Sequence, residues 1–215
     1  MPIVTNYATL VQSILDFTHR GDLASFVDYF IQGAQDQINN DIFDRNEGNG
    51  IRYMEAPFTA TINATTGVVA VPADWLAPKA IQVVQGSAQI STLSFKSVAW
   101  LYANYFNRAP QGLPSVMARE GSNFIFGPFP DAAYALQGTY YALAALLTSG
   151  APTNWMVTNA PLLFQAACIM KAAAFLRDTE LLQTWGALYE GLLVPLINRD
   201  KAERWGMATM QIELG

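Results

Sequence analysis

The apolar residues repeat with a helical period at both ends of the chain and with a strand period in the middle, and this order constrains the fold most. We expect one helix over residues 6–20, capped by Thr5 or Asn6, and another over 23–43, capped by Asp22. Gly21 separates them, and so short a connection makes them antiparallel neighbours. The apolar positions that recur every three or four residues are Leu10, Val11, Ile14, Leu15, Leu23, Val27, Phe30, Ile31, Ala34, Ile38 and Ile42.

The central part of the chain changes to alternation of apolar and polar residues. Strands are predicted at 58–63, 68–71, 81–84 and 134–142, and a hairpin at 115–126 around Gly121-Ser122. Residues 94–106 are predicted to be helical, and 72–76 are predicted to be a loop or a single turn.

The last third is helical again. A helix is expected to start at Asn159 as its cap with Pro161 in its first turn, and Asp178 is expected to cap the next helix. Pro195 is predicted to kink that second helix or to mark a shift in it, and a tail follows from residue 198. The apolar stripes of the two helices are Leu162, Ala166, Ile169, Ala173 and Leu176, then Leu181, Trp185, Leu188, Leu192 and Leu196.

This order predicts an α+β fold, with a four-helix bundle from the N- and C-terminal helix pairs and an inserted small antiparallel β sub-domain. Each helix has a single apolar face and needs another to cover it. The expected boundaries are 1–50 for the N-terminal helices, 51–150 for the β-rich insertion, 151–197 for the C-terminal helices and 198–215 for the tail.

The composition excludes several protein classes. The chain of 215 residues is 52% hydrophobic and 13% charged, which argues against disorder. Its longest apolar run, Tyr140–Leu147, is far shorter than the roughly 20 residues of a membrane-spanning helix. The first ten residues lack a basic region before an apolar stretch, so neither a secretory signal nor a membrane partner is expected. A surface with so few charges indicates burial against partner proteins.

The net charge of −5 comes entirely from the first quarter of the chain. Residues 1–50 contain seven acids and two bases, whereas residues 51–215 contain ten of each. The basic surface that nucleic-acid binding requires is absent, and an acidic surface repels DNA.

Residues for known types of catalytic or metal chemistry are scarce. With one cysteine, Cys168, and one histidine, His19, neither a disulfide within the chain nor an ordinary zinc site can form. No phosphate-binding loop or nucleophile elbow is present. The acidic cluster could in principle supply a carboxylate pair, but it is more typical of a solvated helix face; its members are Asp36, Asp41, Asp44 and Glu47. We therefore expect no catalytic residue, no cofactor and no metal.

Several short segments occur in an order that resembles a known group of proteins. They include Val71-Pro72-Ala73-Asp74-Trp75-Leu76, the pair Tyr140-Tyr141 and Thr153-Asn154-Trp155. Gly112-Leu113-Pro114 followed by residues 124–131, and Asn159-Ala160-Pro161-Leu162-Leu163, complete the pattern. Together they are similar to the head-to-tail adaptors, or connectors, of tailed bacteriophages, the group that includes podovirus tail tubular protein A.

The resemblance implies a structural role and no enzymatic activity. Members of this group assemble as a ring of twelve copies beneath the portal, extend the DNA channel, and dock tail nozzle or fibre proteins on their β part. The protein would be made in the host cytoplasm and reside in the virion neck, where DNA passes without specific binding. The residues that the resemblance puts forward as portal contacts are Arg199, Lys201, Arg204, Trp205, Met210 and Ile212.

The acidic residues of the second helix suggest a related hypothesis. Asp28, Asp36 and Asp44 are expected to make the channel lumen or an exposed rim negative, which would keep DNA from adhering. Two alternatives stay open. One is a neck stopper or tail-completion protein, and the other is a carboxylate-dependent peptidoglycan hydrolase that uses Asp36, Asp41 and Glu47.

Overall fold

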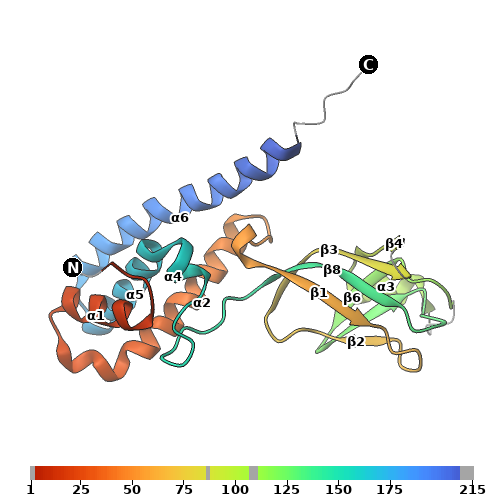
Figure 1. Ribbon diagram of the computed structural model, residues 1–215, viewed down its shortest axis with the longest axis horizontal. Coiled ribbons are helices and arrows are strands. Elements are labelled where there is room, and N and C mark those ends of the chain that lie inside the picture. The colour runs from red at the N-terminus through yellow and green to blue at the C-terminus, as the bar shows by residue number, and fades with distance from the viewer. Residues whose placement is uncertain (1–2, 86–87, 107–110, 209–215) are drawn as a thin grey trace, which may run out of the picture. The chain divides into compact units, whose positions relative to one another are not determined.

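The computed structural model describes residues 3–85, 88–106 and 111–208, with the side chains of 205–208 left out. The chain forms two compact units, one from residues 1–54 and 143–215 and the other from residues 55–142. The first and last segments, red to orange and teal to blue in Figure 1, thus belong to one helical unit. The second unit is built of strands, so the predicted α+β class is confirmed. No helix among the described residues combines the length and apolar character needed to cross a membrane.

The helical unit is organised around one helix, α5. Its elements are α1 (Tyr7–Thr18), η1 (Gly21–Phe26), α2 (Val27–Arg45), η2 (Arg52–Met54), α4 (Trp155–Asn159), α5 (Pro161–Leu176) and α6 (Thr179–Ala208). Helix α5 contacts α1, α2 and α6. Its small buried residues let these helices approach closely, and they are Ala166, Ala167, Cys168, Ala172 and Ala173.

The helix starts follow local hydrogen bonding, which confirms some predicted caps and corrects others. Asn6 caps α1 in a capping box with Thr9, and Asp178 accepts a hydrogen bond from the Leu181 N–H at the start of α6. Asp22 does not cap a helix, because its carboxylate pairs with Arg20 and residues 21–26 form a 3-10 helix.

Two further expectations about the C-terminal third were wrong. Asn159 ends the short helix α4 and does not cap α5; Asn154 caps α4 by accepting from two backbone N–H groups, and Pro161 begins α5 directly after Ala160. The separate tail expected from residue 198 is helical up to Ala208, with Pro195 inside α6.

The β unit consists of two four-stranded sheets. The first has the order β1 (Glu55–Thr61), β8 (Ala135–Ala142), β3 (Trp75–Gln85) and β4 (Ala88–Thr92), all antiparallel. The second has the order β2 (Val68–Ala70), β7 (Asn123–Gly127), β6 (Val116–Glu120) and β5 (Ser94–Phe95), and helix α3 (Val98–Asn104) follows β5. Because β5 pairs with β6 in parallel, the prediction of a purely antiparallel insertion was wrong for this edge.

An aromatic cluster fills the core of the β unit. The ring of Trp75 stacks on Tyr140, with centroids 5.0 Å apart, and meets Phe124 edge-on at 4.7 Å. The Tyr140 hydroxyl donates to Asp74 at 2.8 Å, and burial together with this carboxylate raises the pKa of Tyr140 to about 12. Trp75 and Leu76 begin β3, so the prediction of a loop or a single turn over residues 72–76 was wrong for these two residues.

Gln35 of α2 forms two hydrogen bonds with the segment that follows β8. Its side-chain amide donates to the carbonyl of Ala145 at 3.0 Å, and its carbonyl accepts from the N–H of Leu147 at 2.8 Å. Gln35 is buried, so truncation of its side chain would leave the Leu147 N–H without this acceptor, while the Ala145 carbonyl would keep only the hydrogen bond from the Asn154 amide at 3.0 Å.

We expect Gln35→Ala to lower the free energy of unfolding of the helical unit by about 2 kcal/mol, since one buried and one part-buried hydrogen bond are lost. Urea unfolding monitored by circular dichroism measures this change. Gln32→Ala, at an exposed position of the same helix, is the matched control and should change stability by less than about 0.5 kcal/mol. Equal effects of the two substitutions would show that the Gln35 contacts contribute nothing.

Cys168 provides a probe of the same unit. Its side chain is fully buried in α5, and this burial raises the pKa of the thiol far above its usual range. The folded protein should therefore react with a maleimide at neutral pH at least about 100-fold more slowly than the urea-unfolded chain, because the thiolate is the reacting species. Mass spectrometry over time measures the rates, and rapid labelling of the native protein would contradict the packing described here.

Candidate functional site

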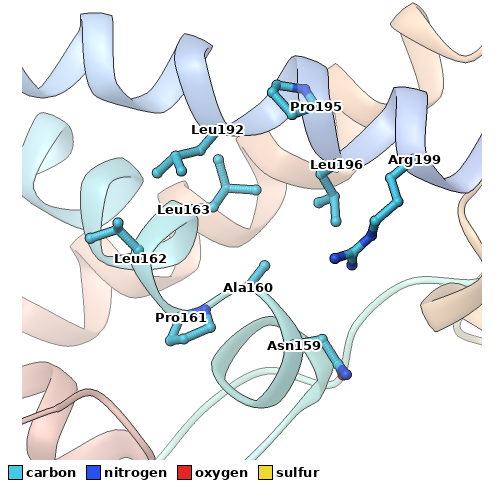
Figure 2. Close-up of a pocket in the computed structure, with 9 residues that line it drawn as sticks. All are labelled: Asn159, Ala160, Pro161, Leu162, Leu163, Leu192, Pro195, Leu196 and Arg199. Atoms are coloured by element: carbon cyan, nitrogen blue, oxygen red, sulfur yellow. The ribbon is translucent and has the colours of Figure 1, made fainter.

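The candidate site is the second half of α6, which extends beyond α5, the helix on which the first half packs. Helices α5 and α6 form a hairpin connected by Arg177 and Asp178, and they have 16 and 30 residues. In an antiparallel hairpin the first half of α6 covers α5, so residues 195–208 continue for about 20 Å past the start of α5. Figure 2 shows this crossing, where Leu192, Leu196 and Arg199 extend from α6 toward Ala160 and Pro161.

A buried carboxylate holds this extended half to the rest of the helical unit. The side chain of Asp200 is 8% exposed and accepts a hydrogen bond from the backbone N–H of Arg52 at 2.9 Å. It also pairs with the guanidinium groups of Arg204 at 2.6 Å and Arg52 at 3.4 Å. Because Arg52 lies in η2, Asp200 connects α6 to the segment that leads into β1.

Of the three candidate portal residues with described side chains, Arg199 is the most exposed. The Arg199 side chain is 58% exposed and donates to the Tyr53 hydroxyl at 3.1 Å. Lys201 is half-buried, and its ammonium lies 3.5 Å from the carbonyl of Arg45. Arg204 is only 28% exposed, because its guanidinium turns inward to Asp200 and to the carbonyl of Gly50. Arg199 and Lys201 thus form the accessible basic part of this helix end.

The remaining candidates of the C-terminal segment are not placed. The side chain of Trp205, and the residues Met210 and Ile212, lie outside the described residues. Sequence reasoning missed Asp200 altogether. Its spacing of four residues from Arg204 was a usable sign of a helical ion pair.

The three candidate channel acids are exposed on α2, but they do not form one stripe. Asp28, Asp36 and Asp44 follow each other at eight-residue steps, which turn by about 80° each around a helix. Asp28 accepts a hydrogen bond from the Tyr7 hydroxyl at 2.7 Å, and this bond raises the pKa of Tyr7. Negative charge is therefore spread over the outer half of α2.

Two of the three acids proposed for hydrolysis, Asp36 and Asp41, lie on different sides of α2. Asp36 and Asp41 are about 140° apart around α2, so their carboxylates face different directions. Asp41 accepts from the hydroxyl of Tyr189 at 2.6 Å, and burial together with this bond raises the pKa of Tyr189. Within the described ranges, no three acidic, histidine or cysteine side chains are grouped so as to hold a metal ion.

Two apolar hollows lie beside the start of α5. The first, of about 320 Å³, is lined by residues 159–163 and by Leu192, Pro195, Leu196 and Arg199 (Figure 2). The second, of about 300 Å³, is lined by Ile3, Val4, Phe17, Pro161, Leu162, Gln165 and Trp185. They share Pro161 and Leu162, and Arg199 is the one charged residue that lines them.

Comparison with known proteins identifies the family. The model of the family described as SU10 adaptor protein matches residues 5–212, which include both units. No curated protein matches the chain. The family consists of structural adaptor proteins of bacteriophages, which are virion components that interact with the portal and tail. The chain therefore belongs to the SU10 adaptor protein family.

Proposed function

We propose that the protein is a head-to-tail adaptor that forms a ring of twelve copies beneath the portal. The ring extends the DNA channel and docks tail nozzle or fibre proteins, with the β unit directed to the tail components. The observation that carries this proposal is the match of the adaptor family over residues 5–212. The extension of α6 past α5 supports it, because a protruding helix end is available to a partner.

The proposed portal contact is the end of α6 with the residues that follow it. Arg199 and Lys201 supply accessible positive charge, and Trp205, Met210 and Ile212 supply apolar and aromatic groups of the kind enriched in protein interfaces. Arg204 contributes indirectly, because its ion pair with Asp200 stabilises the end of α6.

The acidic part of α2 is proposed to face the channel or its rim. Asp28, Asp36 and Asp44 are exposed, and DNA binding requires positive groups that neutralise phosphates. A negative surface at these positions lets DNA pass during packaging and ejection without adhering.

The portal contact is tested with Arg199→Glu/Lys201→Glu, a double variant that leaves Asp200 and Arg204 in place. Deletion of the whole segment from 198 would remove the Asp200 anchor and confuse binding with folding. We expect the affinity for the cognate portal protein to fall at least tenfold, since the proposed contact loses both of its accessible cations and gains two acids. Arg177→Glu, an exposed reversal at the other end of α5, is the control.

Binding titration of each variant with the portal protein measures the affinity, and the mass of each mixture shows which complexes form. Unchanged affinity of the double variant would contradict the α6 contact. Copy number and position in a virion reconstruction test the adaptor assignment itself, because a neck stopper or tail-completion protein would occupy a different level of the neck.

A further inference from the structure

The loop between α2 and η2 contains the dipeptide Asn49-Gly50. Asparagine is a chemically labile residue, and it is most labile before glycine, because glycine has no Cβ to shield its backbone nitrogen. Asn49 is the one asparagine of the sequence that a glycine follows directly. Spontaneous loss of a side-chain amide is therefore expected here before any other position of the chain.

The local structure leaves the reacting groups accessible. Asn49 is exposed and lies outside any helix or strand, so water reaches its side chain. Its amide donates to the carbonyls of Asn46 and Glu47 at 3.2 and 3.3 Å, at the long end of the usual range for such bonds. Among the described residues, none accepts a hydrogen bond from the Gly50 N–H. The amide that would leave is thus held weakly, and the nitrogen that would attack is available.

The reaction needs only these two residues and one water molecule. The Gly50 nitrogen gives up its proton and bonds to the side-chain carbon Cγ of Asn49, and the bond from Cγ to Nδ2 breaks to release ammonia. Water then opens the resulting succinimide at either of its carbonyls, which yields aspartate or isoaspartate. One asparagine and one water become one acid and one ammonia, and no oxidant or reductant takes part.

The Gly50 carbonyl is an acceptor for the end of α6. It accepts from the side-chain amide of Asn46 at 2.8 Å and from the guanidinium of Arg204 at 2.5 Å. Arg204 also pairs with the buried Asp200, which holds the extended half of α6. An isoaspartate lengthens the main chain before Gly50 by one carbon atom, so it displaces this carbonyl from Arg204.

We propose that Asn49 is a modification site, at which the folded protein spontaneously forms isoaspartate and aspartate and thereby loosens the end of α6. The conversion requires no enzyme or partner, so it advances with the age of each molecule. Because the end of α6 is the proposed portal contact, aged chains should bind the portal more weakly than fresh ones. That consequence rests on the proposed function, whereas the modification itself does not.

Peptide mapping of the aged full-length protein tests the modification. The protein is kept at body temperature and mildly alkaline pH, where the backbone nitrogen loses its proton more readily, and samples are digested and analysed by mass spectrometry over time. We expect the peptide with Asn49 to gain about 1 Da at least about tenfold faster than the peptide with Asn63. Asn63 is a control within the same molecule, since it is also exposed and outside helices and strands but precedes Ala64. Equal rates for the two peptides would overturn the proposal.

Hydrogen exchange tests the effect on α6. The backbone amides of residues 200–204 should exchange at least about fivefold faster in the aged protein than in the fresh one. Aged Asn49→Gln should keep the fresh rate, because the longer side chain cyclises far more slowly and the exposed loop position tolerates it. If exchange in α6 is unchanged after Asn49 has converted, the proposed loosening is wrong. Neither result bears on the adaptor function, which the position of the protein in the virion tests separately.

Discussion

Asp200→Ala should lower the free energy of unfolding of the helical unit by about 3 kcal/mol. The substitution leaves the inward-facing guanidinium of Arg204 and the N–H of Arg52 without their shared acceptor. Removing one partner of a buried ion pair costs about 3–5 kcal/mol, and the lower end applies because Arg52 is partly exposed. Chemical denaturation, with the slow labelling of Cys168 as a second readout, measures the loss.

Two further substitutions separate the buried carboxylate from ordinary surface charge. Asp200→Asn keeps an acceptor for the Arg52 N–H and should lose less than the alanine variant. Glu203→Gln removes a partner of Arg52 whose side chain is 46% exposed, and should cost less than about 1 kcal/mol. If Asp200→Ala lowers the free energy of unfolding no more than Glu203→Gln does, Asp200 does not hold the end of α6 to the rest of the helical unit.

Gly138→Ala should destabilise the β unit by about 3 kcal/mol or more. Gly138 lies on the inner strand β8, between Phe58 of β1 and Ile81 of β3. A Cβ at this position would meet the Ala80 carbonyl oxygen at 2.2 Å and the Ile81 Cα at 2.8 Å. Both are backbone atoms of a paired strand, so relief requires the strands to separate.

Gly191→Ala serves as the opposite control. Nothing lies within 4 Å of a Cβ built at Gly191, which is inside α6. This substitution should raise stability by up to about 1 kcal/mol, because alanine favours the helix. Thermal unfolding followed by the fluorescence of the five tryptophans, which include Trp75 in the β core and Trp185 in the helical unit, compares the two variants. A Gly138→Ala protein as stable as the unmodified one would show that the close strand approach does not exist.

The sequence predicted the elements whose signals are local. The apolar stripes of α1, α2, α5 and α6 follow the helical period, and the β6–β7 hairpin has a two-residue turn at Gly121. Strand β4 was missed because its residues are mostly exposed and do not alternate. The parallel pairing of β5 with β6 was not predictable from local pattern, since it joins Ser94 to Val116 across a helix and a loop.

The portal contact at the end of α6 stays a prediction, and the sequence did not reveal how its charged residues pair. A cluster of cations near the end of the chain suggested a surface contact, yet Arg204 faces inward because Asp200 is buried beside it. The helix itself continues to Ala208 because these tertiary contacts hold it, whereas local propensity alone suggested a tail. The two apolar hollows also escaped sequence reasoning, because each joins residues that lie far apart along the chain.

The insertion of residues 55–142 between the two parts of the helical unit sets an order for folding during synthesis. All strands of the β unit are made before α5, so its two sheets can close while α1 and α2 still lack their main packing partner. The apolar face of α2 therefore stays uncovered in the ribosome-bound chain until α5 and α6 emerge. Chaperone binding to nascent chains should accordingly persist through synthesis of the β unit and end only with the last helix.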